Sequence, residues 1–102
     1  MLRQVDLDIR VAMASEDTST VVPAKLSMLG AGGAFLEILK LFAVSSSVTL
    51  HFTLPSTPPA DILCAAQVRY AIDGKGLGLQ FLDLTPEQRK SITSFVRLTL
   101  DI

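Results

Sequence analysis

The feature that most constrains this chain is an alternation of apolar and polar side chains with a period of two. In the stretch VDLDIRVAM the apolar side chains would share one face of a strand, with Asp6, Asp8 and Arg10 on the other. Such alternation is typical of strands that are buried on one side only. It recurs along the chain and predicts six strands, over residues 5–13, 21–29, 33–38, 48–54, 62–70 and 77–81.

Three local features refine these strands. Pro23 has no amide proton to donate to a neighbouring strand, so the second strand is expected at an edge or with a bulge. In the fifth strand, unbroken alternation places Tyr70 on the same inward face as Val68. Asp73 and Gly74 predict a tight hairpin turn in which both central residues have positive φ.

The C-terminal part of the chain differs because its apolar residues follow helical spacing. Thr85 is expected as the N-cap, Pro86 at the first helical position and Gln88 as the capping-box partner. The expected buried stripe consists of Ile92, Phe95, Val96 and Thr99. A helix of about 14 residues is marginal alone, so it must pack on the sheet. We therefore expect a mainly β fold, a closed or nearly closed six-stranded antiparallel barrel with a C-terminal helix.

Length and composition favour one domain over residues 1–102, since 49% of the residues are apolar and can form a core. No apolar run reaches the roughly 18 residues of a membrane-spanning helix, so no membrane insertion is expected. Asp6 and Asp8 stand where a signal peptide would be apolar. Cys64 is the sole cysteine, which excludes an internal disulfide and fits a reducing, cytoplasmic location.

The charged and nucleophilic residues do not suggest an enzyme or a nucleic-acid protein. The formal net charge is −1 and the basic residues are scattered, so duplex nucleic acid is not expected as a partner. His51, the one histidine, falls on the polar face of its strand, and Cys64 falls on the apolar face of its own. We expect no catalytic residue, no metal site and no cofactor.

The glycine-rich stretch KLSMLGAGGAFLEI resembles a phosphate-binding loop only superficially. A dinucleotide fingerprint that starts at Gly30 would need a third glycine where Phe35 stands, followed by a helix. A P-loop would need Gly-Lys-Ser/Thr, which is absent. The residues that follow have strand periodicity, so neither nucleotide motif is met.

Read in order, several short segments of the chain resemble the PilZ domain, a bacterial receptor family for cyclic di-GMP. The matching segments are GGAFLE, VTLHFTLP, AAQVRY, GLGLQFLDLTPEQR and ITSFV, which cover most of the chain after about residue 20. The resemblance implies a six-stranded barrel with a C-terminal helix and a role in cyclic di-GMP signalling. It also implies an association with motility, type IV pili or exopolysaccharide.

The resemblance further implies a ligand site at two family motifs, Arg-x-x-x-Arg and Asp/Asn-x-Ser-x-x-Gly. Here the corresponding residues are Arg3, Arg10, Met28, Gly30 and Gly33, of which only Gly33 fits the second motif. In the family, arginine forks suit phosphates and guanine edges, and the glycine is expected to permit a special backbone conformation.

Both motifs are altered in this chain. The second arginine would fall at Leu7 if the motif begins at Arg3, and at Ala14 if it begins at Arg10. An alternative register of the second motif keeps Ser27 and Gly30 but places Lys25 at the Asp/Asn position. We favour the first register because it also aligns AFLE with a family strand.

These departures favour a non-enzymatic regulatory module that acts as an adaptor through an unidentified protein partner, with weak or absent cyclic di-GMP binding. The alternative is a true receptor whose modified site uses Arg3, Arg10 or Lys25. The least favoured hypothesis is an unrelated small barrel that binds single-stranded nucleic acid, since aromatic residues are only 6% of the chain. Leu39–Val44 and the C-terminal residues Leu98, Leu100 and Ile102 are candidate partner surfaces, although both are better explained as core or lid.

Overall fold

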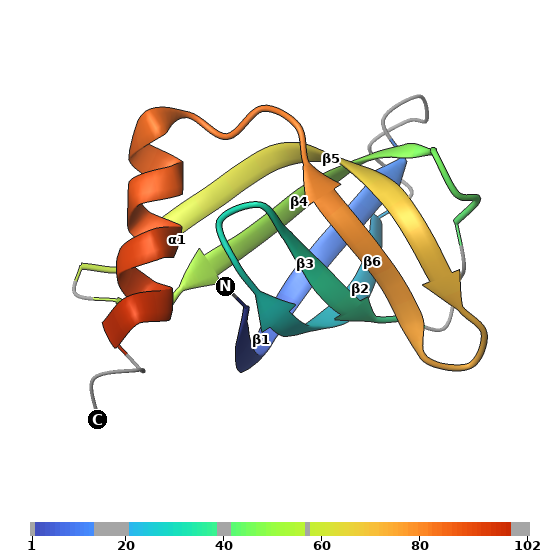
Figure 1. The fold of residues 1–102 in the computed structure, drawn as a ribbon, viewed down its shortest axis with the longest axis horizontal. Coiled ribbons are helices and arrows are strands. Elements are labelled where there is room, and N and C mark those ends of the chain that lie inside the picture. Colours follow the sequence, from blue (N-terminus) through green and yellow to red (C-terminus); the bar gives the residue numbers. More distant parts are fainter. Residues whose placement is uncertain (1, 14–20, 39–41, 57, 99–102) are drawn as a thin grey trace.

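The computed structural model describes residues 2–13, 21–38, 42–56 and 58–98. These residues form six strands followed by one helix, which confirms the mainly β class (Figure 1). The elements are β1 (Arg3–Met13), β2 (Val21–Leu29), β3 (Gly33–Glu37), β4 (Ser47–Leu54), β5 (Ala60–Ile72), β6 (Gly76–Phe81) and α1 (Pro86–Leu98).

The strands close into an antiparallel barrel in the order β1-β2-β3-β6-β5-β4. Closure leaves no strand of the barrel without two neighbours, as expected for a small β protein that must avoid open edges. The crossing from β3 to β6 brings together segments that are far apart in the sequence. Figure 1 shows α1 at one end of the barrel and the β5–β6 hairpin at the other.

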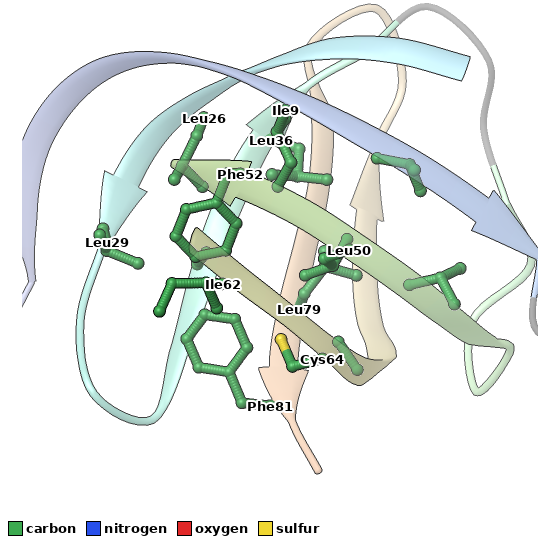
Figure 2. Packing of buried hydrophobic residues seen from close by; sticks show 14 of the residues in the cluster. Ile9, Leu26, Leu29, Leu36, Leu50, Phe52, Ile62, Cys64, Leu79 and Phe81 are labelled. Carbon is green, nitrogen blue, oxygen red and sulfur yellow. The ribbon is translucent and has the colours of Figure 1, made fainter. Parts of the chain in front are cut away.

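The inward faces of the six strands form one apolar core (Figure 2). In β4 the alternation is complete, with Val48, Leu50, Phe52 and Leu54 buried. Figure 2 shows side chains such as Ile9, Leu36 and Leu79 converging from different strands. No polar or charged side chain is buried among the described residues, so the interior is held by apolar packing.

Pro23 lies where β2 has only one paired neighbour. It is opposite Arg10 of β1, whereas the ladder between β2 and β3 begins at Lys25. The missing amide proton of proline therefore breaks no ladder on the β3 side. β2 as a whole is therefore not an edge strand of the closed barrel, but its segment around Pro23 pairs on one side only, and a bulge lies further along at Ser27.

The hairpin between β5 and β6 forms as expected, but its turn differs from the prediction. The amide of Lys75 donates to the carbonyl oxygen of Ile72 at 2.9 Å, and Gly74 has a φ of 76°. Asp73 does not have positive φ, so only one central residue is left-handed. The ladder closes at Ile72 and Gly76, and a three-residue connection does not require the mirror-image turn of a two-residue hairpin.

The helix begins as predicted with a reciprocal capping box. The amide of Gln88 donates to the Thr85 hydroxyl at 3.1 Å, and the Thr85 amide donates to Oε1 of Gln88 at 3.0 Å. Ile92, Phe95 and Val96 are buried, which confirms the stripe, whereas Thr99 lies outside the described residues. Within the described ranges, no helix has both the length and the apolar character needed to cross a membrane.

The two candidate partner surfaces named from the sequence fall largely outside the described residues. Positions 39–41 and 99–102 and the side chain at position 98 lie outside the described part of the chain. In the remainder, Phe42 is buried and belongs to the core, whereas Val44 is exposed.

Tyr70 does not lie on the inward face of β5, so that expectation is wrong. The β5–β6 ladder pairs Val68 with Leu79 and Tyr70 with Gly78, which leaves Arg69 as an extra residue on β5. A β-bulge of one residue reverses the alternation beyond it. Tyr70 is accordingly 51% exposed.

Candidate functional site

The main candidate site is a hollow of about 510 Å³ on the outer surface of the barrel, where β2, β3, β6 and β5 lie side by side. Its volume falls in the range of small-molecule and peptide-side-chain sites. The side chains that shape it include Leu2, Met28, Phe35, Arg69, Tyr70 and Ile72. We refer to it as the outer hollow.

Two bulges turn side chains toward the outer hollow. In β2, Leu26 is opposite Leu36 and Met28 is opposite Phe35, so Ser27 is the extra residue. In β5 the extra residue is Arg69. Each bulge shifts the alternation by one, which presents Met28 from one side and Tyr70 from the other to the same surface.

The rings of Phe35 and Tyr70 form the floor of the outer hollow. Their centroids are 6.2 Å apart, with an angle of 30° between the ring planes. Between them lies Gly78, where an added Cβ would clash with the ring of Tyr70. The absence of a side chain at Gly78 therefore lets the tyrosine ring lie flat over β6.

Arg3 is the first of the five positions that the family resemblance assigned to a ligand, and it contacts the helix. Its Nη1 donates to the carbonyl oxygen of Phe95 at 3.0 Å, and its guanidinium carbon lies 4.2 Å from the centroid of the Phe95 ring. Its Nε is shielded from solvent and has no hydrogen-bond partner among the described residues. Arg3 joins the start of β1 to the last turns of α1.

Arg10 is remote from Arg3 and from the outer hollow. It lies exposed in the middle of β1, opposite Pro23 of β2 and His51 of β4. It lines a separate depression of about 410 Å³ with Asp8 and Thr53. The structure therefore does not bring the two arginines together.

Met28 and Gly33 both border the outer hollow, whereas Gly30 is buried in the turn between β2 and β3. The amide of Gly30 donates to the carbonyl oxygen of Gly33 at 2.9 Å and closes this turn. Neither Gly30 nor Gly33 has a positive φ, so the special backbone conformation expected for the motif glycine is not observed. Gly33 is needed for close approach instead, since a Cβ there would clash with the Leu79 carbonyl oxygen of β6.

Lys25 and Ser27, the residues of the alternative register, are engaged within the protein. Nζ of Lys25 lies 2.8 Å from Asp8 and 3.6 Å from Asp6, and all three side chains are exposed. The hydrogen bond and charge of Lys25 lower the pKa of Asp8, and the same contacts raise the pKa of Lys25. The hydroxyl of Ser27 donates to the carbonyl oxygen of Phe35 at 3.3 Å.

Cys64 and His51 lie on opposite faces of the barrel wall. Burial raises the pKa of the Cys64 thiol to about 11, with a smaller contribution from the carboxylate of Asp83. Figure 2 shows the Cys64 side chain among the core residues, while His51 is exposed. Within the described ranges no three His, Cys, Asp or Glu side chains gather as metal ligands.

Sequence reasoning did not identify Phe35, Arg69 or Tyr70 as site residues. The alternation rule assigns Tyr70 to the core unless a bulge intervenes, and the bulge is visible only in the pairing with β6. One signal was available in the sequence, namely Gly78 inside a mostly apolar strand, because a glycine there can mark a bulge or close approach of a large side chain. In the structure that side chain is Tyr70.

Similarity to known proteins was found at the level of sequence family and fold. A family model described as the PilZ domain matches residues 2–98. The structure is similar to the Bacillus subtilis inhibitor of motility MotI/DgrA, with a TM-score of 0.83 and 16% identity. It is also similar to the PilZ domain of CeSA from a cellulose-synthesizing bacterium, with a TM-score of 0.71 and 19% identity.

The two alignments differ in how much of the other protein they cover. The first covers 98% of this chain and 50% of the Bacillus protein, so this chain spans about half the length of that relative. The second covers 100% of this chain and 99% of the CeSA domain. At these identities the likenesses show a shared fold. No curated protein gave a significant match.

Proposed function

The chain belongs to the PilZ domain family, a family of cyclic di-GMP receptor-type modules, and on this premise we propose that it is a non-enzymatic adaptor that acts through contact with a partner protein. The observation that carries the proposal is the nature of the outer hollow. It is bordered by Met28 and Gly33, two positions assigned by resemblance to the ligand, yet Arg69 is the one charged residue among the described residues that line it. An apolar surface of this kind suits protein contact better than a dianionic ligand.

The placement of the other motif residues supports weak binding of cyclic di-GMP. Arg3 is held by Phe95, and Arg10 lies on another part of the surface. Met28 offers neither a charge nor a strong hydrogen bond. Each charge-assisted contact that is lost costs about 1.5–3 kcal/mol. Two such losses would raise a dissociation constant by roughly two to four orders of magnitude.

A receptor with a modified site is the second candidate, and Arg69 beside an aromatic pair is the observation in its favour. A guanine could stack on the rings while Arg69 bound a phosphate or a guanine edge. Arg3, Arg10 and Lys25, the residues that the sequence suggested for such a site, support it less. Arg3 contacts Phe95, Arg10 lines another depression, and Lys25 is already paired with Asp8.

The setting that we propose is the bacterial cytoplasm, where cyclic di-GMP acts and where a free, buried cysteine such as Cys64 persists. One of the similar proteins is an inhibitor of motility, and the other is a PilZ domain from a cellulose-synthesizing bacterium. We propose an output of the same kind, control of motility, type IV pili or exopolysaccharide, for this chain.

A calorimetric titration of the purified chain with cyclic di-GMP tests the proposal. We expect no saturable heat below roughly 100 μM ligand. In a parallel NMR titration, the backbone amide shifts of Met28 and Gly33 should not change. A parallel titration with GMP controls for nonspecific stacking. Stoichiometric, micromolar binding that is lost in Arg3→Ala, Arg10→Ala or Arg69→Ala would instead establish the receptor.

A further inference from the structure

We propose that the outer hollow is the docking site for an extended segment of a partner protein, in which apolar side chains are flanked by an aspartate or a glutamate. The apolar side chains would cover Phe35 and Tyr70, and the carboxylate would pair with Arg69. This inference rests on the proposed adaptor function and specifies the surface and the chemistry of the partner.

The apolar part of the inference comes from exposed side chains that the fold itself does not need. Leu2, Tyr70 and Ile72 are 57%, 51% and 41% exposed, and all three line the outer hollow. Contiguous exposed apolar surface next to a concavity is typical of an interaction site. The hydrophobic effect therefore favours burial of this surface by a partner.

The charge of the partner follows from the surroundings of Arg69. Within the described part of the chain Arg69 has no ion pair, and its Nη1 has only a long contact of 3.5 Å to Oε1 of Gln67. Lys25, by contrast, already has two carboxylates. An arginine fork that is free of acidic neighbours suits a carboxylate, bidentate and permanently charged.

One cation fits one carboxylate better than it fits two phosphates. A cyclic dinucleotide would bring two negative charges onto a surface where, within the described ranges, Arg69 is the one charged lining residue. Each unmatched charge would lose water without gaining a partner. A protein segment with one acidic residue meets the same arginine without that cost.

The floor of the outer hollow is already formed in the chain without a partner. Phe35 of β3 and Tyr70 of β5 lie on either side of β6 in a closed barrel, and the absence of a side chain at Gly78 leaves room for the tyrosine ring over β6. Fixed aromatic rings beside an arginine are the residue types that dominate binding energy at interfaces. Met28, with its flexible side chain, can adapt at the border.

Random linear peptides displayed on phage, panned against the immobilised full chain, provide the test. We expect enriched peptides to combine apolar residues with an adjacent Asp or Glu. A synthetic enriched peptide should bind at least about tenfold more weakly to Tyr70→Ser and to Ile72→Ser, by fluorescence anisotropy. Panning against Arg69→Glu should enrich Lys or Arg in place of the acidic residue.

Leu63→Ser is the matched control, because Leu63 is also an exposed apolar residue of β5, at 62%, but does not line the outer hollow. It should leave peptide affinity unchanged. Thermal unfolding of each variant shows whether the fold is retained. If Tyr70→Ser disturbs the sheet, the loss of peptide affinity in Ile72→Ser provides the test of the docking site.

The contrary outcomes are distinct. Peptides that lose affinity in Leu63→Ser but not in Tyr70→Ser would overturn this location while leaving the adaptor function standing. Enrichment without an acidic preference would overturn the role of Arg69. Micromolar cyclic di-GMP binding that requires Arg69, with no peptide enriched, would overturn both proposals. Self-association that is lost in Tyr70→Ser would assign the outer hollow to a second copy and overturn the inference.

Discussion

Replacing Arg3 by methionine should loosen the attachment of α1 to the barrel. Methionine keeps an unbranched apolar stem of similar length but removes the guanidinium, which donates to the Phe95 carbonyl and lies over the Phe95 ring. The change therefore tests whether Arg3 serves the fold rather than a ligand.

The magnitude follows from three contributions. A charged hydrogen bond contributes about 1.5–3 kcal/mol, and a cation–π contact about 0.5–2 kcal/mol. Removal of the shielded, unpaired Nε of Arg3 returns about 1–3 kcal/mol. Taken at the midpoints of these ranges, the net loss of stability is about 1.5 kcal/mol, which corresponds to a fall in Tm of roughly 6–12 °C for a chain of this size.

Urea unfolding followed by circular dichroism measures this loss, and Arg10→Met is the control. Arg10 lies on the same strand but is exposed, so its replacement should change the unfolding free energy by less than about 0.5 kcal/mol. Hydrogen exchange should additionally accelerate in the last turns of α1 in Arg3→Met alone. Equal, small effects of the two substitutions would refute the role of Arg3 in holding the helix.

Two further predictions concern the barrel wall. Gly33→Ala should lower the free energy of unfolding, measured in urea, by about 2–3 kcal/mol, because the added Cβ would clash with the Leu79 carbonyl oxygen. Gly32→Ala is the control and should change this free energy by less than about 0.5 kcal/mol, because the space around Gly32 is open. Similar losses in the two variants would refute the close-approach role of Gly33. Stability should also fall by at most about 2 kcal/mol as the pH rises from 9.0 to about 11, because the unfolded chain loses its Cys64 proton first. Below this window the contribution of the neutral thiol is complete, and the same fall in Cys64→Ala would contradict the assignment.

Much of the fold could be predicted because it depends on local patterns. The alternation of side chains located all six strands, and β2 begins and ends at the residues expected. Thr85 and Gln88 predicted the helix start, since a capping box involves neighbours in the sequence. Proline at position 23 indicated an edge-like segment for the same local reason.

The sequence alone therefore determined the number of strands, the inward face of most of them and the C-terminal helix. The tertiary structure decided the pairing of β3 with β6, the contact of Arg3 with Phe95, and the outer hollow. Periodicity cannot reveal a bulge, because the extra residue is defined only against a partner strand. That one-residue shift at Arg69 carries Tyr70 from the predicted core to the surface.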